Sequence, residues 1–108
     1  MSVIRGTTPD FVLQLPGYSL TGKTVYVTLK QAKNELTLTG DQLSVAVDER
    51  GSTIAFSMTQ EMTLDFVAGS AEIQVKAIDA DGHVDATEIG RVVLQKALLE
   101  KVIEYAED

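Results

Sequence analysis

The amino-acid sequence predicts an all-β fold, an antiparallel β-sandwich followed by one short amphipathic helix. Two observations predict the sandwich: apolar and polar residues alternate with a period of two in run after run, and turn-rich clusters such as LTGD, DERG and DADG separate the runs. At the end of the chain, by contrast, glycine and proline are absent and the apolar residues have helical spacing. We therefore expect the sandwich over residues 1–94 and the helix over residues 95–108.

The composition is that of one folded domain. The 108 residues are 44% hydrophobic and 23% charged, which suits a domain with a single core. Cysteine is absent, so stability must come from packing and not from disulfides. The first residues lack the basic and apolar regions of a signal peptide, and no apolar run has the length of a membrane span. We expect neither feature, and a cytoplasmic protein.

Each predicted strand has one apolar face, which we assign to the core. Thr7, Thr8 and Pro9 lead into the first strand, because threonine favours extended backbone and proline suits the start of an edge strand. The residues expected to face inward are Phe11, Leu13 and Leu15, then Val25, Val27 and Leu29, then Leu43, Val45 and Val47, then Ile54, Phe56 and Met58, and finally Ala71, Ile73, Val75 and Ala77.

Two segments depart from the strand pattern before the end of the chain. In TQEMTLDF, Met62 and Phe66 lie four residues apart, and Ser57 and Thr59 precede them as possible caps. This spacing predicts a single helical turn that connects the two sheets. Gly90 falls inside the last predicted strand, where an isolated glycine indicates a β-bulge.

The C-terminal segment QKALLEKVIEYAED carries an apolar stripe. Leu98, Leu99, Val102 and Ile103 fall on one face of the predicted helix, and they are our candidate interaction residues. Glu100 and Glu104 form a repulsive pair, and so short a helix is marginal by itself, so the stripe needs a surface to pack on. That surface is either the sandwich or another subunit.

Charge is unevenly distributed along the chain. Residues 1–54 contain five acidic and five basic side chains, whereas residues 55–108 contain eleven acidic and four basic ones, so the second half carries the whole net charge of −7. This excess provides solubility or attracts a basic partner. It disfavours nucleic acid, which is bound mainly through its phosphates.

No group of residues indicates catalysis or a cofactor. Asp79, Asp81 and Asp85 surround Gly82, but the spacing and the bidentate glutamate of a calcium-binding EF-hand loop are absent, so we interpret DADGHVD as a hairpin turn. His83 has no evident nucleophile partner. The carboxylates of Asp48 and Glu49 lie in another predicted turn, where solvated charge is the usual state. We expect no enzyme, no cofactor and no metal site.

Four stretches of the chain together resemble a known family. IRGTTPDFVLQL, LTGKTVYVTLKQ, TLTGDQLSVAVDERGSTIAFSMTQEMTLDF and GSAEIQVKAIDADGHVDATEIGRVVL resemble the immunoglobulin-like domain at the N-terminus of phage baseplate upper proteins and of related small prophage tail proteins. The resemblance covers Ile4 to about Leu94 and consists of strand and turn patterns. It implies an immunoglobulin-like β-sandwich that serves as a virion building block. Baseplate upper proteins continue into a helical stalk and a further domain, whereas this sequence ends at Asp108.

The sequence therefore favours a structural or assembly protein of a phage or prophage tail or baseplate. Its partners would be other phage structural proteins or a second copy of itself, with neither nucleic acid nor membrane involved, and it would pass from the cytoplasm into the virion. The alternative is a carbohydrate-binding β-sandwich. Against the alternative, tryptophan is absent, and Tyr18, Tyr26 and Tyr105 are far apart in the sequence.

Overall fold

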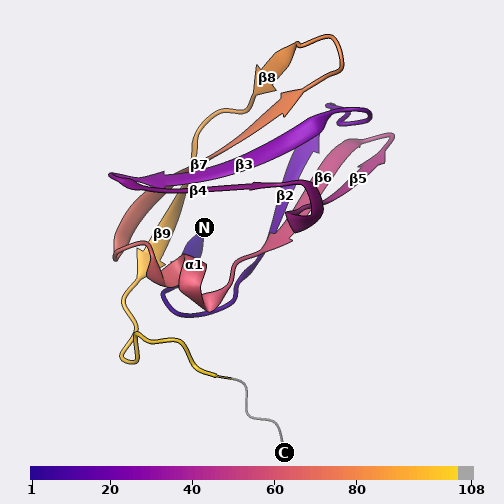
Figure 1. Cartoon of the computed structure of the whole chain (residues 1–108). Helices are drawn as coiled ribbons and strands as arrows, with labels where there is room; N and C mark the ends of the chain where they lie inside the picture. The colour runs from indigo at the N-terminus through magenta and orange to yellow at the C-terminus, as the bar shows by residue number, and fades with distance from the viewer. Residues whose placement is uncertain (105–108) are drawn as a thin grey trace, which may run out of the picture.

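Two β-sheets face each other across a shared apolar core in the computed structural model, which describes residues 1–104 (Figure 1). The larger sheet has the strand order β1 (Ser2–Ile4), β9 (Gly90–Gln95), β7 (Gly69–Ile78), β3 (Thr24–Gln31) and β4 (Asn34–Thr39), and β8 (Val84–Ala86) also pairs with β7. The smaller sheet has the order β2 (Asp10–Pro16), β6 (Gly51–Ser57) and β5 (Ser44–Asp48). The predicted β-sandwich is confirmed.

The order of the strands is that of an immunoglobulin-like fold. In that fold strands B, E and D share one sheet and strands C, F and G share the other. Here β2, β6 and β5 take the first three places, and β3, β7 and β9 take the others in the same chain order. β4 extends the larger sheet beyond β3, and β1 pairs in parallel with β9 at the opposite edge of the same sheet.

The predicted alternation describes the central strands correctly. The inward-facing residues of β3, β6 and β7 are all buried, and Phe11 of β2 stacks on Phe56 of β6 with ring centroids 4.8 Å apart. Burial of a large apolar side chain contributes about 1.5–3 kcal/mol, so this layer dominates the stability of the domain. The buried apolar residues are Val3, Phe11, Leu20, Val25, Val27, Leu29, Leu38, Ile54, Phe56, Met58, Phe66, Ala71, Ile73, Val75, Ala77, Val92 and Leu94.

The predicted burial of Val45 and Val47 is wrong. Val45 lies opposite the fully buried Ile54 in the register of β5 and β6, so these valines are on the expected face of the sheet. Both are nevertheless exposed. The reason is that β5 is an edge strand, with a neighbouring strand on one side only.

Two strands of the larger sheet were not predicted. β4 follows β3 through Ala32, which has a left-handed φ of 50°, so no glycine marks the turn. β1 pairs with β9 from the other end of the described chain, and nothing local in the sequence indicates this pairing.

The predicted helical turn is confirmed as α1 (Gln60–Leu64). The hydroxyl of Thr59 accepts a hydrogen bond from the Met62 amide at 3.2 Å and so caps its first turn. α1 carries the chain from β6 in the smaller sheet to β7 in the larger one (Figure 1). η1 (Gly40–Gln42), a short 3-10 turn, joins β4 to β5. Neither helical segment of the described chain is long and apolar enough to cross a membrane.

The predicted C-terminal helix is wrong over residues 95–104, because Gln95 is the last residue of β9 and residues 96–104 contain no helix. The remainder of that prediction, residues 105–108, lies outside the described residues. Glu100 binds Arg5 instead of facing Glu104 across a helical turn, and the backbone of Ile103 bonds the side chain of Gln60. These long-range contacts compete successfully with a short helix that carries a repulsive glutamate pair.

We expect Gly51→Ala to destabilise the domain severely. Gly51 has a φ of 139°, and a Cβ atom there lies 2.3 Å from the carbonyl oxygen of Leu15 and 2.8 Å from the Gly17 nitrogen, both in backbone. The free energy of unfolding should fall by at least about 3 kcal/mol in urea titration. Gly22→Ala is the matched control, because φ is 72° there but no atom lies within 4 Å, so only the backbone strain of about 1–2 kcal/mol applies. Equal losses in the free energy of unfolding for Gly51→Ala and Gly22→Ala would contradict the clash at Gly51.

Candidate functional site

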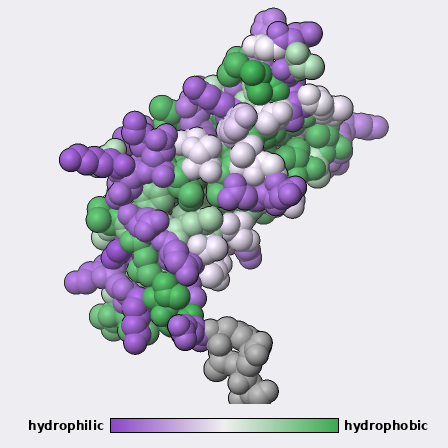
Figure 2. All heavy atoms as spheres, in the orientation of Figure 1, coloured by the Kyte–Doolittle hydropathy of each residue, from purple (hydrophilic) through white to green (hydrophobic). Residues whose placement is uncertain are grey.

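The four candidate interaction residues lie on a segment that leaves the end of β9. We name residues 96–104 the C-terminal arm. The relative exposure of the residue is 107% for Leu98, 53% for Leu99, 40% for Val102 and 59% for Ile103. None of the four residues is therefore buried against the sandwich. Figure 2 shows apolar side chains at this end of the visible face, beside the last described residues.

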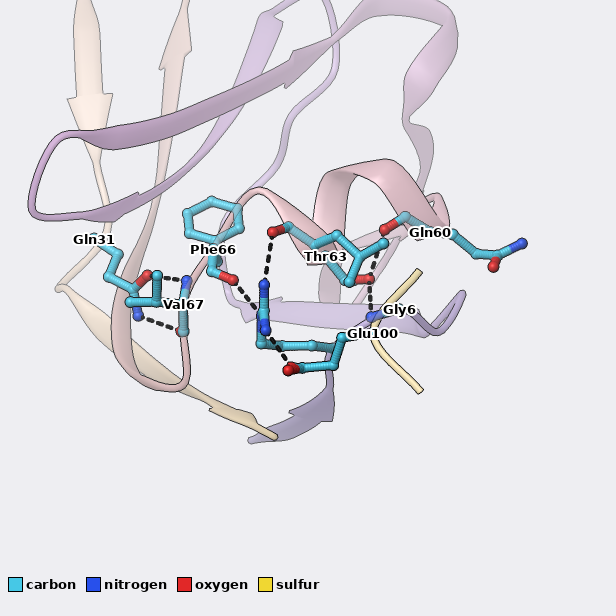
Figure 3. Close-up of polar contacts among 9 residues, drawn as sticks. Gly6, Gln31, Gln60, Thr63, Phe66, Val67 and Glu100 are labelled. Atoms are coloured by element: carbon cyan, nitrogen blue, oxygen red, sulfur yellow. Dashed lines mark hydrogen bonds and ion pairs between the residues drawn. The ribbon is translucent and has the colours of Figure 1, made fainter. Parts of the chain in front are cut away.

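Two contacts fix the C-terminal arm to the domain. The side-chain amide of Gln60 bonds the backbone of Ile103 in both directions, donating from Nε2 to the carbonyl at 2.9 Å and accepting at Oε1 from the amide at 2.7 Å. The carboxylate of Glu100 forms an ion pair with the guanidinium of Arg5 (Figure 3). The arm consequently has a defined path over the surface, although its apolar side chains face solvent.

Arg5 is the centre of the polar contacts beneath the arm. Its Nε donates to the carbonyl oxygen of Phe66 at 2.6 Å, and its Nη2 donates to that of Leu64 at 3.0 Å. These carbonyls lie at the C-terminal end of α1, where backbone oxygens lack helical partners and a cation is favoured. One planar guanidinium thus holds α1, the first strand and the arm together.

Buried polar side chains complete this end of the molecule (Figure 3). The hydroxyl of Thr63 accepts from the Gly6 amide at 2.9 Å and lies 3.0 Å from the carbonyl oxygen of Thr7, to which it donates. The side chain of Gln31 in β3 bonds the backbone of Val67 in both directions, at 2.8 and 2.9 Å. The chain entering β2 is therefore fixed to α1, and the chain leaving α1 is fixed to β3.

A second feature is a groove between β2 and the strand pair β7–β8. Its volume is about 640 Å³. Leu15, Leu20, Val75 and Ala77 provide its apolar lining. Because β2 and β8 belong to different sheets, the groove opens directly onto the core between them.

The mouth of the groove is polar. Tyr18 donates from its hydroxyl to Asp85 Oδ2 at 2.6 Å, and Lys23 Nζ donates to the same hydroxyl at 2.8 Å. The hydrogen bond to Tyr18, with Asp85 nearby, raises the pKa of Lys23 above its ordinary value, so its ammonium stays charged at neutral pH. Tyr18 and Asp85 lie 67 positions apart in the sequence, which explains why sequence reasoning did not bring them together.

A β-bulge shapes the wall of this groove. Ile73 lies opposite Gly90 and Lys76 lies opposite Ala86, so two residues of β7 face three residues, 87–89, of the other strand. The strand that runs beside β7 is therefore interrupted at these residues and counted as two strands, β8 and β9. The bulge that was predicted at Gly90 lies at residues 87–89, immediately before Gly90.

The candidate chemical residues lie in turns or at strand positions next to them: Asp79, Asp81, His83 and Glu49 are in turns, as predicted, whereas Asp85 lies in β8 and Asp48 ends β5. The backbone amides of His83 and Asp81 donate to Asp79 Oδ1 at 3.0 and 2.9 Å and close the hairpin between β7 and β8. The bond from His83 is the main reason why the pKa of the Asp79 carboxyl lies below its ordinary value. Asp48 is the last residue of β5, opposite Gly51, and Glu49 lies in the turn that leads to β6. Among residues 1–104, no cluster of three or more acidic or histidine side chains could hold a metal ion.

No protein-family model matches the chain, and a search of curated proteins finds no match. Among solved structures, the fold is similar to a mutant of the SrpA adhesin from Streptococcus sanguinis, with 13% identity and a TM-score of 0.49 over 88% of this chain and 54% of the adhesin chain. It is also similar to AggA, the major subunit of aggregative adherence fimbriae type I from Escherichia coli, with 12% identity and a TM-score of 0.46 over 89% of each chain. The chain thus spans about half of the adhesin chain it matches.

We expect Arg5→Lys to loosen the end of the molecule that contains α1. Lysine keeps the charge but cannot reach the carbonyls of Leu64 and Phe66 and the carboxylate of Glu100 in one plane. The free energy of unfolding should fall by about 1.5–3 kcal/mol. Glu100→Gln removes only the exposed ion pair and should cost about 1 kcal/mol or less. Hydrogen exchange at α1 should rise in the first variant only, and equal exchange in both would contradict the assignment.

We expect the hairpin between β7 and β8 to lose stability in acid. The pKa of Asp79 is lowered in the folded protein, so its carboxylate stabilises the fold above the ordinary value of 3.8 and loses this effect as pH falls through the lowered pKa. Asp79→Ala should therefore lower the melting temperature at neutral pH and change it little below that pKa. Asp81→Ala is the control, since no hydrogen bond to its side chain is found in the described residues. A pH-independent difference would contradict this account.

Proposed function

We propose that this chain is a non-enzymatic structural module of a phage or prophage tail or baseplate, and that it acts through protein–protein contacts. The observation that carries the proposal is the C-terminal arm. It exposes Leu98, Leu99, Val102 and Ile103 at least in part, while Gln60 holds its backbone and Arg5 holds the side chain of Glu100. A fixed apolar surface of this kind is typical of a site that another protein covers.

The energy available from this surface suits assembly. Complete burial of each of the four side chains would contribute about 1.5–3 kcal/mol before the cost of association. Because Gln60 and Arg5 already order part of the arm, less conformational entropy is lost when a partner binds. The surface can therefore support a specific contact of moderate strength.

The phage setting rests on the resemblance of residues 4–94 to the immunoglobulin-like domain of baseplate upper proteins. The segments that carry this resemblance form the strands of the sandwich and the turns between them. A virion component would be made in the cytoplasm and then incorporated into the particle. The acidic second half of the chain favours a basic neighbour in that particle.

The residues that could carry chemistry are poorly placed for it, which supports a non-enzymatic role. His83 lies on an exposed hairpin, bound through its amide to Asp79, and Asp48 uses its carboxylate to accept from the Arg50 amide at 2.8 Å. Such carboxylates organise turns. We infer that the acidic side chains act in solubility and in partner choice.

We expect Leu98→Asp combined with Leu99→Asp to abolish incorporation into phage particles without unfolding the domain. Both side chains are exposed, so the melting temperature should stay within a few degrees of that of the unchanged protein. Particles purified after prophage induction should contain the unchanged chain, as measured by mass spectrometry. Val84→Asp, at an exposed apolar position on the hairpin, is the matched control and should still be incorporated. Absence of the unchanged chain from particles would refute the proposed function.

A carbohydrate-binding module is the alternative that the sequence leaves open. Tyr18 lines the groove, but its hydroxyl is already paired with Asp85 and Lys23, and Tyr26 lies on β3, which does not line this groove. These positions provide no pair of neighbouring aromatic rings for a sugar. Binding on a glycan array that Tyr18→Ala removes would favour the alternative.

A further inference from the structure

The smaller sheet has an open edge along β2. In the constant-type immunoglobulin fold a further strand, A, lies beside strand B in the same sheet. Here β2 takes the place of strand B and pairs only with β6 within the described chain, because β1 joins the opposite sheet beside β9. The outward backbone groups of β2 are therefore available to another strand.

The open edge lies beside the groove. The 640 Å³ hollow continues along β2 into a second hollow of about 260 Å³. The two hollows share Gln14, Leu15, Val75, Thr87 and Glu88. Leu13 and Leu15 point toward the core from β2 but are only partly buried. An extended segment beside β2 would pair with its backbone and cover these two side chains.

We propose that the C-terminal arm of one copy occupies this place beside β2 in a second copy. This inference rests on the proposed function and names the partner of the same arm. The chemistry of the two surfaces is complementary. In an extended arm Ala97, Leu99, Lys101 and Ile103 share one face, so three apolar side chains and one cation meet an apolar groove rimmed by the carboxylates of Asp85 and Glu88.

The positions of the two surfaces favour a contact between copies. The arm leaves the domain at the end that contains α1, whereas β8, which lines the larger hollow, lies at the opposite end (Figure 1). Arg5 and Gln60 also hold the arm near α1 in its own domain. The contact joins two different surfaces, so repeated use gives a ring or an open chain of subunits.

The contacts of the arm with its own domain compete with this exchange. Ile103 must leave the side chain of Gln60 before its backbone can pair with β2. Gln60→Ala should therefore strengthen self-association, lowering the concentration of half-association about tenfold in sedimentation or light scattering. Leu99→Asp should abolish self-association. These opposite changes distinguish arm exchange from a general effect on folding.

Cross-linking tests where the arm lies. The chain has no cysteine, so single-cysteine variants give one reactive site each. Leu98→Cys and Gln14→Cys, carrying different tags, should be joined by a short bismaleimide about tenfold more efficiently than Leu98→Cys and Thr37→Cys. Gln14 lies on β2 and Thr37 lies on β4, the far edge of the other sheet, and both side chains are exposed.

The outcomes separate this inference from the proposed function. Equal cross-linking to Gln14→Cys and to Thr37→Cys overturns the arm exchange. So does a monomeric state at every concentration for both the unchanged chain and Gln60→Ala. If Leu98 and Leu99 are still required for incorporation into particles in that case, the proposed function stands with a different partner. Preferential cross-linking to Gln14→Cys together with stronger association of Gln60→Ala supports the exchange.

Discussion

The path of the first strand depends on the contacts of Arg5. Its amide donates to the carbonyl oxygen of Gln95 at 2.9 Å and so continues the pairing of β1 with β9, while its guanidinium binds the carbonyls at the end of α1. Charge-assisted bonds of this kind are roughly twice as strong as neutral ones. They keep the first strand beside the larger sheet. The edge of β2 is open for that reason, and the same guanidinium positions the arm through Glu100.

The sequence predicts those parts of the fold that depend on local chemistry. Alternation identified the buried faces of β3, β6 and β7, and Thr59 identified the start of α1, because both signals lie within a few residues. β4 was missed because Ala32 adopts the left-handed conformation that usually indicates glycine. The C-terminal helix was predicted from spacing alone. The bonds that Gln60 makes to Ile103, 43 positions away, cannot be seen in that spacing.

The candidate site was predictable in one half only. The apolar residues of the arm stand out in the sequence, and the structure leaves Leu98 and Leu99 exposed. The groove, in contrast, is formed by β2 and by residues about 70 positions later in the other sheet, and only the packing of the two sheets brings them together. Sequence periodicity gives the face of each strand, but it does not give the place where two sheets separate at their edges.

The open edge of β2 is limited at both ends, which restricts what can pair with it. An unpaired strand edge can pair with almost any extended segment, and folded proteins counter this with charges and proline. β2 begins at the exposed Asp10 and ends at the exposed Pro16, which has no amide hydrogen to donate. Only the stretch between them offers a continuous backbone ladder beside apolar side chains. A partner segment must therefore be short and apolar on one face, and the arm of a second copy pairs with β2 only at the cost of the bonds that Gln60 makes to Ile103 in its own domain.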